Sequence, residues 1–340
     1  MHADVVSFGE TMLRLTAPVG IRLESASSLD IYVGGTESNT LACLARLGLQ
    51  VQWLSALPLN PLGRLVDSEL RRHAIDTSQV VWTSGTDRLG IFYVEETAPP
   101  LGVQVYYDRA HSACAQIDPE AIDYSIVDHA RLLHLTGITP ALGTGARTAF
   151  ERFLERARTH NVALSFDVNY RARLWSEQEA ASAIEMACHQ AAILISSYED
   201  AVDLWHCHGS AEEVLRQLDG RFAVDNTSKS ASTSLSRSKT LVLTLGKNGS
   251  AQLAHDTYAH APISPMQGGT RFGSGDAFAA GYLYANLNGP LYQEFAEQGI
   301  TPLVFANTLA ALKRGIHGDI ATITPDDLRA VLQTKQARFR

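Results

Sequence analysis

Cysteine is scarce in this chain of 340 residues, which contains four: Cys43, Cys114, Cys188 and Cys207. They are scattered and form no C-x-x-C pair, so we expect no disulfide framework and predict a reducing, cytosolic (cytoplasmic) environment. The sequence also lacks an apolar run long enough to cross a membrane, and its first residues lack the basic start of a signal peptide. We therefore expect neither a membrane span nor secretion.

Clusters of basic residues are missing as well. Lysine and arginine number 28 against 36 aspartates and glutamates, which gives a formal net charge of −8. Without a basic patch, the chain is expected to bind neither nucleic acid nor a membrane surface. An anionic ligand would therefore be held by a few local cations and backbone N–H groups, against the charge of the whole protein.

Two common nucleotide-binding motifs are absent. The chain has neither a G-x-x-x-x-G-K-[ST] loop nor a G-x-G-x-x-G fingerprint after its first apolar run, which argues against a P-loop NTPase and a conventional dinucleotide enzyme. His206, Cys207 and His208 have the side chains of metal ligands, but three adjacent residues of a helix or strand cannot all point at one ion. We interpret them as the polar end of a helix before Gly209.

What the chain does contain is a regular alternation of apolar runs and amphipathic stretches. With 45% hydrophobic residues, it is long enough for one large α/β domain or two smaller ones. Strands are predicted at residues 5–8, 51–57, 132–136, 162–168, 192–196 and 241–245, and helices at 37–47 and 63–73. Such alternation predicts a parallel sheet covered by helices on both faces.

Three segments depart from this alternation. Residues 11–33 and 87–109 alternate as strands do, with no helix between, which predicts a small antiparallel sheet that projects from the main domain. Such a sheet is a candidate lid, and because a second subunit could cover its edge, we predict a homodimer or higher homo-oligomer. Residues 225–239 are rich in serine and threonine and poor in apolar residues, so we expect a surface loop there.

The most informative segment is the glycine-rich stretch at residues 268–276, which leads into the apolar, helical pattern of 277–284. Glycines let the backbone approach an anion, and the first N–H groups of a helix have no intrahelical acceptor. The segment therefore predicts a phosphate cradle. Asp276 lies at its end, where a carboxylate can cap the helix or take a proton from a hydroxyl group beside the cradle.

Two sequence signatures, far apart and in the expected order, resemble those of the ribokinase-like (PfkB) carbohydrate kinases. Residues 34–39 and 44–48 are similar to the N-terminal sugar-binding signature, and residues 273–278 to the C-terminal signature. The resemblance extends over the whole chain. It implies a single α/β kinase domain, residues 1–340, with a central, mostly parallel sheet, helices on both faces, and a small β-sheet lid built from residues 11–33 and 87–109.

Within that family the chain is most similar to 2-keto-3-deoxygluconate kinases. Residues 9–15, 106–113, 134–140 and 166–175 carry this similarity. A keto-deoxy sugar acid has a carboxylate, which a guanidinium binds through its planar fork. The resemblance implies that Arg109 and Arg171 bind this carboxylate. The remaining implied sugar contacts are Gly34, Gly35, Asn39, Tyr93 and Tyr107.

The same resemblance implies ATP-dependent phosphorylation of the sugar acid to its 6-phosphate, with Mg²⁺ as cofactor. Asp276 would be the catalytic base, and the backbone N–H groups of Gly273, Ser274 and Gly275 would face the transferred phosphoryl group. The implied nucleotide contacts are Asn169, Ser197, Thr244, Gly246, Gly249 and Asn307.

Two departures from the family pattern are visible. Thr270 and Arg271 replace the acidic residue that usually precedes the glycine-rich turn, and residues 197–200 replace the N-x-x-E motif that places Mg²⁺ through water. Glu199 or Asp200 could take over that second role. Two alternatives stay open: a kinase of fructose or another neutral sugar in the same fold, and a non-catalytic, sugar-binding regulatory protein.

Overall fold

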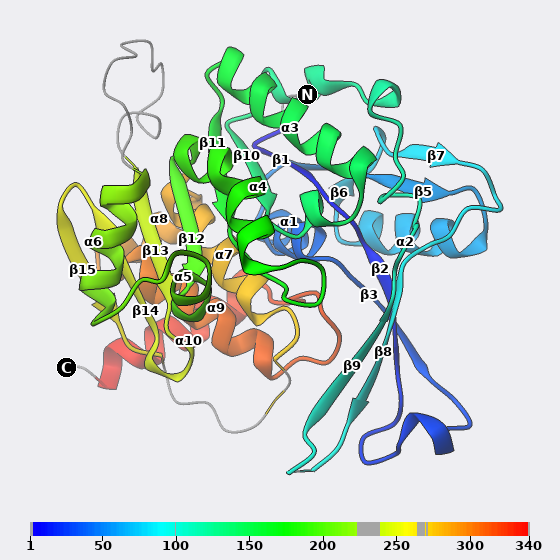
Figure 1. Cartoon of the computed structure of the whole chain (residues 1–340). Helices are drawn as coiled ribbons and strands as arrows, with labels where there is room; N and C mark the ends of the chain where they lie inside the picture. The colour runs from blue at the N-terminus through cyan, green and yellow to red at the C-terminus, as the bar shows by residue number, and fades with distance from the viewer. Residues whose placement is uncertain (1–2, 99, 223–238, 264–268, 270, 339–340) are drawn as a thin grey trace.

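The main body of the protein is built around one nine-stranded sheet with the order β15-β14-β13-β12-β11-β10-β1-β4-β6 (Figure 1). The computed structural model describes residues 3–98, 100–222, 239–263, 269 and 271–338. Neighbouring strands from β6 to β13 are parallel, and β14 and β15 are added antiparallel at one edge. The strands are β1 (Val5–Phe8), β4 (Val51–Leu54), β6 (Ile75–Asp76), β10 (Leu132–Thr136), β11 (Ala163–Asp167), β12 (Ile193–Ser197), β13 (Thr240–Thr244), β14 (Ser250–Ala254) and β15 (Thr257–Ala261).

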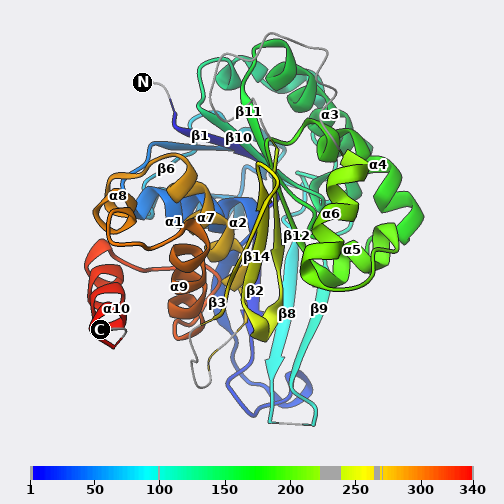
Figure 2. The ribbon, with the colours of Figure 1, turned by 90° about the vertical axis from the view of Figure 1, so that its left-hand side faces the viewer.

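Helices cover both faces of this sheet, as Figure 2 shows. One face carries α1 (Thr36–Arg46), α2 (Pro61–Arg72), α7 (Ser274–Asn286), α8 (Pro290–Ala296), α9 (Pro302–Arg314) and α10 (Pro325–Arg338). The other face carries α3 (Thr144–Thr159), α4 (Glu177–Gln190), α5 (Tyr198–Trp205) and α6 (Ala211–Phe222). Each helix layer packs its apolar side chains onto the sheet, so a separate hydrophobic core forms on either face.

The elements follow the apolar runs of the sequence closely. β10 spans the predicted residues 132–136, and β1, β11, β12 and β13 lie within one residue of their predicted bounds. The predicted strand 51–57 is divided, because the chain leaves the main sheet at Ser55 and β5 (Ala56–Pro58) pairs with β7 (Val81–Thr83). The expected parallel sheet with helices on both faces is confirmed.

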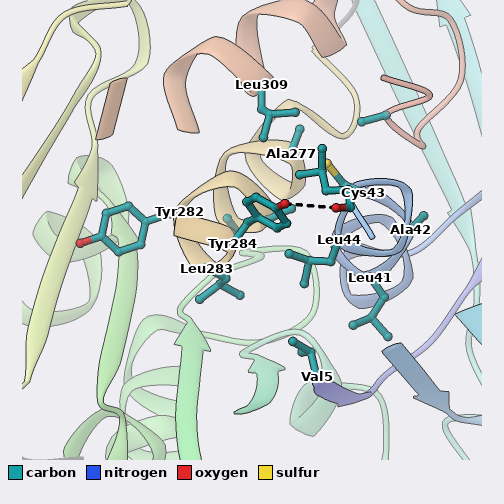
Figure 3. Packing of buried hydrophobic residues seen from close by; sticks show 14 of the residues in the cluster. Val5, Leu41, Ala42, Cys43, Leu44, Ala277, Tyr282, Leu283, Tyr284 and Leu309 are labelled. Carbon is teal, nitrogen blue, oxygen red and sulfur yellow. Dashed lines mark hydrogen bonds between the residues drawn. The ribbon is translucent and has the colours of Figure 1, made fainter. Parts of the chain in front are cut away.

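Helix α7 lies between α1 and α9 in its layer (Figure 3). Gly281 permits a close approach of α9, because a Cβ at this position would lie 2.9 Å from the Cα of Ala306. On the other side, Tyr284 packs near Leu44 and donates a hydrogen bond of 3.1 Å to the carbonyl oxygen of Leu47, just after α1. Contacts on both flanks therefore fix the position of α7.

A second sheet of four strands, the lid sheet, projects from the body with the order β3-β2-β8-β9 (Figure 1). Its strands are β2 (Met12–Thr16), β3 (Asp30–Gly34), β8 (Ile91–Glu96) and β9 (Val103–Asp108). β2–β3 and β8–β9 are antiparallel pairs, but β2 and β8 are parallel. The prediction of an antiparallel sheet is therefore wrong for this central pairing, because the two hairpins leave the body in the same direction and meet along their first strands.

Several smaller expectations can also be compared with the structure. α5 ends at Trp205, and His206 follows in the left-handed conformation, so this segment is a helix end; among the described residues, no group of three His, Cys, Asp or Glu side chains could hold a metal ion. All four cysteines are buried, free thiols. None of the described helices is both long and apolar enough to cross a membrane. The serine-rich segment 225–239 lies outside the described residues, except for Lys239.

Candidate active site

The glycine-rich turn ends in an open helix N-terminus. Gly273 is the N-cap of α7, with φ at 71° and no side-chain cap bond. A Cβ at Gly273 would lie 1.9 Å from the carbonyl oxygen of Asp319, so only glycine fits this turn. The hydroxyl of Ser274 donates back to the carbonyl oxygen of Arg271 at 2.8 Å. The N–H group of Ser274 donates to the carbonyl oxygen of Arg271 at 3.3 Å. Among the described residues, the N–H groups of Gly275 and Asp276 are therefore the ones left to face an anion.

Asp276 is not the cap of this helix, since it lies three residues inside it. Its carboxylate accepts two hydrogen bonds of 2.7 Å, from the hydroxyl of Thr36 and from the side-chain amide of Asn39. Both donors belong to α1. The structure therefore brings the two sequence signatures together, although they lie about 240 residues apart.

The loop after β11 adds a third segment to this site. Asn169 has a positive φ of 42°. Its amide donates to the hydroxyl of Thr36 at 3.1 Å and to the carboxylate of Asp167 at 3.2 Å. A chain of hydrogen bonds thus runs from Asn169 through Thr36 to Asp276. The sequence analysis missed the roles of Thr36 and Asp167, although both lie in segments that it singled out.

Three carboxyl groups crowd this edge of the sheet. Burial raises the pKa of Asp276, while the hydrogen bonds from Asn39 and Thr36 lower it. Burial and the nearby charges of Asp276 and Asp200 raise the pKa of Asp167 to about 8. Burial also raises the pKa of Asp200. Burial is the largest cause in each case, so all three carboxyls are harder to ionise than an exposed aspartate.

Arg171 is the cation that lies among these carboxyls. Its positive charge lowers the pKa of Asp276, Asp167 and Asp200. The side chain is exposed, and no described residue forms a hydrogen bond or ion pair with its guanidinium. Its guanidinium can therefore receive an anionic group, and its predicted role as a contact of the sugar carboxylate stays a prediction.

Arg109 is less available than the sequence suggested. Its Nε and Nη2 atoms donate to one carboxylate oxygen of the buried Glu10, at 2.8 and 2.5 Å. Ser112 donates to the other oxygen of the same carboxylate. One edge of the Arg109 fork is thus occupied, and Nη1 is the part that these bonds leave for a ligand. The ion pair with Glu10 was not expected.

The two tyrosines of the lid sheet lie on opposite faces. In the β8–β9 ladder Tyr107 is opposite Phe92, while Tyr93 is opposite Tyr106. Because side chains alternate along a strand, Tyr107 shares its face with Phe92, which packs near Phe272 beside the glycine turn. Tyr93 points away from that face, and the sugar contacts of both tyrosines stay predictions.

Four of the six implied nucleotide contacts lie at the carboxyl ends of β12 and β13, beside the carboxyl end of β11 where Asp167 lies. Gly246 and Gly249 have φ values of 55° and 92°, in a tight turn after Thr244. Ser197 caps α5 by accepting a hydrogen bond of 2.9 Å from the backbone N–H of Asp200. The structure thus brings these positions together at the carboxyl ends of the strands. The hydroxyl of Ser197 is already used to cap α5.

Asn307 is an implied nucleotide contact whose side-chain amide is already hydrogen-bonded within the protein. Its amide donates to the carbonyl oxygen of Ala261 at 3.0 Å and accepts a bond of 3.1 Å from Ser250. The side chain is buried. These bonds fasten α9 to β14 and β15, so Asn307 positions the neighbouring backbone and its amide is engaged there.

Steric contacts explain the glycines of the first signature. A Cβ at Gly34 would lie 2.7 Å from Cγ of Asp319, and a Cβ at Gly35 would lie 2.3 Å from the carbonyl oxygen of Glu10. Larger residues would push these segments apart. The structure also separates the two acidic candidates of the 197–200 segment, because Glu199 is exposed whereas Asp200 accepts a bond of 3.2 Å from the backbone N–H of Tyr170.

The fold and this site define a sugar kinase of the ribokinase-like class. The chain belongs to the pfkB family of carbohydrate kinases, whose pattern matches residues 2–326. The resemblance found in the sequence is thereby confirmed, and the protein is a carbohydrate kinase.

The chain is also similar to individual kinases of this family. The 2-dehydro-3-deoxygalactonokinase of Haloferax volcanii is 34% identical over 333 residues, which cover 98% of each chain. The 2-dehydro-3-deoxygluconokinase of Bacillus subtilis is 27% identical over 336 residues, 94% of this chain and 92% of that protein. The crystal structure of 2-dehydro-3-deoxygluconokinase from Thermotoga maritima superposes with a TM-score of 0.83 at 29% identity, covering 98% of this chain and 100% of the other.

Replacement of Asp276 by asparagine tests its role as the base. Asp276→Asn keeps the size of the side chain, so we expect a folded protein with the thermal midpoint nearly unchanged. Loss of the proton acceptor should lower kcat by roughly 100- to 10,000-fold. Steady-state kinetics on purified protein measure this, with the exposed Asp203→Asn on α5 as control. Near-normal kcat in Asp276→Asn would refute the assignment.

Proposed function

We propose that the protein phosphorylates 2-keto-3-deoxygluconate, also named 2-dehydro-3-deoxygluconate, with ATP as the phosphoryl donor. The observation that carries this proposal is a buried carboxylate, Asp276, in the first turn of α7, on which the charge of Arg171 acts; no described residue pairs with that guanidinium. A base next to an open helix N-terminus suits phosphoryl transfer, and a guanidinium beside both suits an acceptor that has a carboxylate. The names of the relatives, which are kinases of keto-deoxy sugar acids, support the same acceptor class.

In this mechanism the C6 hydroxyl group of the sugar acid attacks the γ-phosphorus of ATP in line. The new O–P bond forms while the bond from the γ-phosphorus to the bridging oxygen breaks, and ADP leaves with that oxygen. Asp276 accepts the proton of the hydroxyl group. The N–H groups of residues 273–276 face the oxygens of the transferred phosphoryl group, where negative charge must be stabilised.

The environment of Asp276 suits a base. Burial raises its pKa above that of an exposed aspartate, and the hydrogen bonds from Asn39 and Thr36 keep the rise in check. A base whose pKa lies closer to the working pH takes up a proton more effectively. The bonds from α1 also hold the carboxylate in one orientation.

We place ATP along the edge formed by the ends of β12 and β13, over the turn that contains Gly246 and Gly249. Support comes from the topology, since ligands of open α/β sheets bind outside the carboxyl ends of the strands. The positive φ values of both glycines let the backbone approach the nucleotide closely.

Asp200 is the residue that we propose to hold Mg²⁺ through water. The fit rests on Asp200 itself, a partly buried carboxyl whose charge acts on Asp167 and whose pKa burial raises. Magnesium keeps most of its waters and needs one or two carboxylates beside the phosphates. When bound, Mg²⁺ supplies positive charge that offsets the charge of the phosphate groups.

The galactonate epimer of the sugar acid is a second candidate substrate. The Haloferax volcanii relative, at 34% identity, is named for 2-dehydro-3-deoxygalactonate. The two epimers share the carboxylate that Arg171 would bind and the C6 hydroxyl group that Asp276 would deprotonate. Neutral sugars lack this carboxylate, and a regulatory protein would not need Asp276.

A coupled assay of ADP release tests the substrate class. With Mg·ATP, we expect rapid turnover of 2-keto-3-deoxygluconate or its galactonate epimer and much slower turnover of fructose and ribose. Arg171→Ala should raise KM for the sugar acid by roughly 10- to 100-fold, the worth of a charged hydrogen-bonded pair. The same variant assayed with fructose serves as the control, because fructose has no carboxylate.

Two outcomes would contradict this assignment. Preferential turnover of a neutral sugar would remove the carboxylate role of Arg171 while leaving Asp276 as the base. Absence of turnover on all four compounds, despite specific binding of one of them, would favour the regulatory alternative.

The magnesium dependence separates Asp200 from Glu199. Both residues lie in the first turn of α5, but Asp200 is partly buried and its charge raises the pKa of Asp167, whereas Glu199 is exposed. We expect Asp200→Asn to raise the Mg²⁺ concentration for half-maximal rate by roughly 10-fold or more, as loss of an outer-shell group commonly does. Glu199→Gln is the matched control and should behave as the wild type. A magnesium effect confined to Glu199→Gln would reverse the assignment.

We also propose that two copies of the chain associate through the outer face of the lid sheet. Ile31, Leu15, Tyr93 and Tyr106 lie in register across β3, β2, β8 and β9 on that face. Ile31 and Tyr106 are 56% and 48% exposed. An apolar row across a projecting sheet is covered favourably by its own copy, because the same surface then serves both subunits.

Light scattering coupled to size exclusion measures the oligomeric state. The wild type should elute as a dimer at micromolar concentration, and Ile31→Glu should convert it to a monomer, because a charge would be buried in the interface. Val19→Glu, at an exposed position of the loop after β2, is the matched control. A monomeric wild type would refute the proposal.

A further inference from the structure

Lys313, near the end of α9, has no exposed surface. Its ammonium group donates hydrogen bonds of 2.9 Å to the carbonyl oxygens of Ile316 and Gly318. Burial of an ammonium is costly unless acceptors replace its water, so a lysine in this position requires a specific reason. The mechanism above makes no use of it.

The segment that Lys313 holds packs directly against the glycine turn. A Cβ at Gly273 would lie 1.9 Å from the carbonyl oxygen of Asp319 and 3.2 Å from Cε of Lys313 itself. The side chain of Asp319 also lies against Gly34, where a Cβ would be 2.7 Å from its Cγ. Lys313 and residues 316–319 therefore pack against both the start of α7 and the N-terminal signature at residues 34–39.

The charge of Lys313 acts on the base. Its ammonium is among the groups that lower the pKa of Asp276. Burial lowers the pKa of Lys313 to about 8, so the ammonium stays mostly charged at neutral pH. The other charged groups that act on Asp276 or Lys313 are Arg171 and Asp167 from β11 and its following loop, Glu37 from α1, Asp319 after α9, and Arg14 from β2.

We propose that Lys313 is a positioning residue of the kinase site, which fixes the Gly273 turn through residues 316–319 and places a positive charge near Asp276. In this role Lys313 acts through Gly273 and Asp276, and not by contact with the sugar. The inference rests on the proposed role of Asp276 as the base.

The pH dependence of kcat/KM tests this proposal, because its acid limb reports the pKa of the base in the free enzyme. Lys313→Met removes the charge and keeps most of the side-chain volume. We expect the acid limb to move upward by about one pH unit, the effect of losing a nearby opposite charge. The KM values for ATP and acceptor should change little, so the loss appears mainly in kcat.

The chain offers a matched control at Lys239. This lysine is also buried, and its ammonium also donates to backbone carbonyl oxygens, those of Cys188, His189 and Phe222. It precedes β13, at the opposite end of the strands from Asp276. Lys239→Met should lower the thermal midpoint as Lys313→Met does, but the acid limb should stay in place.

Asp319→Asn keeps the proposal testable if Lys313→Met fails to fold. It removes a negative charge that acts on Asp276 and keeps the shape of the side chain. We therefore expect its acid limb to move downward, opposite to that of Lys313→Met. An acid limb that stays at the wild-type pH in both variants, or in Asp319→Asn where Lys313→Met is unfolded, would overturn the proposal.

These assays use whichever carbohydrate the wild type phosphorylates fastest. An incorrect sugar-acid assignment thus leaves the test of Lys313 intact. Failure of Asp276 as the base would show instead as an Asp276→Asn variant that retains its turnover.

Discussion

Asp276 loses most of its water when α7 packs between α1 and α9, and the hydrogen bonds from Thr36 and Asn39 replace part of that hydration. The rest of the site depends on this replacement of water by hydrogen bonds from the protein. Because both donors lie on α1, the base is positioned by helix packing, to which Gly281 contributes by letting α9 approach. Fewer or weaker donors would leave a buried carboxyl that stays protonated and cannot accept a proton. Stronger ion pairing would make it a poor base.

The electrostatics of the site follow from the same constraint. The chain carries a net charge of −8 and gathers Asp167, Asp200 and Asp276 at one sheet edge, yet the family to which it belongs handles phosphate groups. The local cations Arg171 and Lys313 and the open start of α7 supply positive potential where it is needed. Such an arrangement lets an acidic protein bind anions without a basic surface, because groups at short range outweigh the distant net charge.

Local patterns were sufficient to predict most of the fold. Apolar runs defined β1, β10, β11, β12 and β13 to within one residue, and the glycine-rich turn identified the start of α7. What the sequence could not reveal were pairings between distant segments. Which carboxylate binds Arg109, and on which face of the lid sheet a tyrosine lies, depends on the register of two hairpins. Lys313 was overlooked for a related reason, since a lysine in the last turn of an amphipathic helix normally faces water.

Arginines fasten the lid sheet to the body of the protein. Arg14 of β2 is 2% exposed and binds Glu96 of β8 at 2.9 Å and Asp319 of the body at 3.2 Å. Its guanidinium also stacks 4.1 Å from the ring of Phe272, beside the glycine turn. A buried guanidinium between two carboxylates is expensive to separate, so the base of the lid moves with the catalytic turn. Toward the tip, Val103 is half exposed. Arg173, in the loop after β11, donates a hydrogen bond of 2.7 Å to the carbonyl oxygen of Val105 in β9, further out than Arg14. Bending of the lid over a sugar is therefore expected beyond Val105, while the contacts around Asp319 stay fixed.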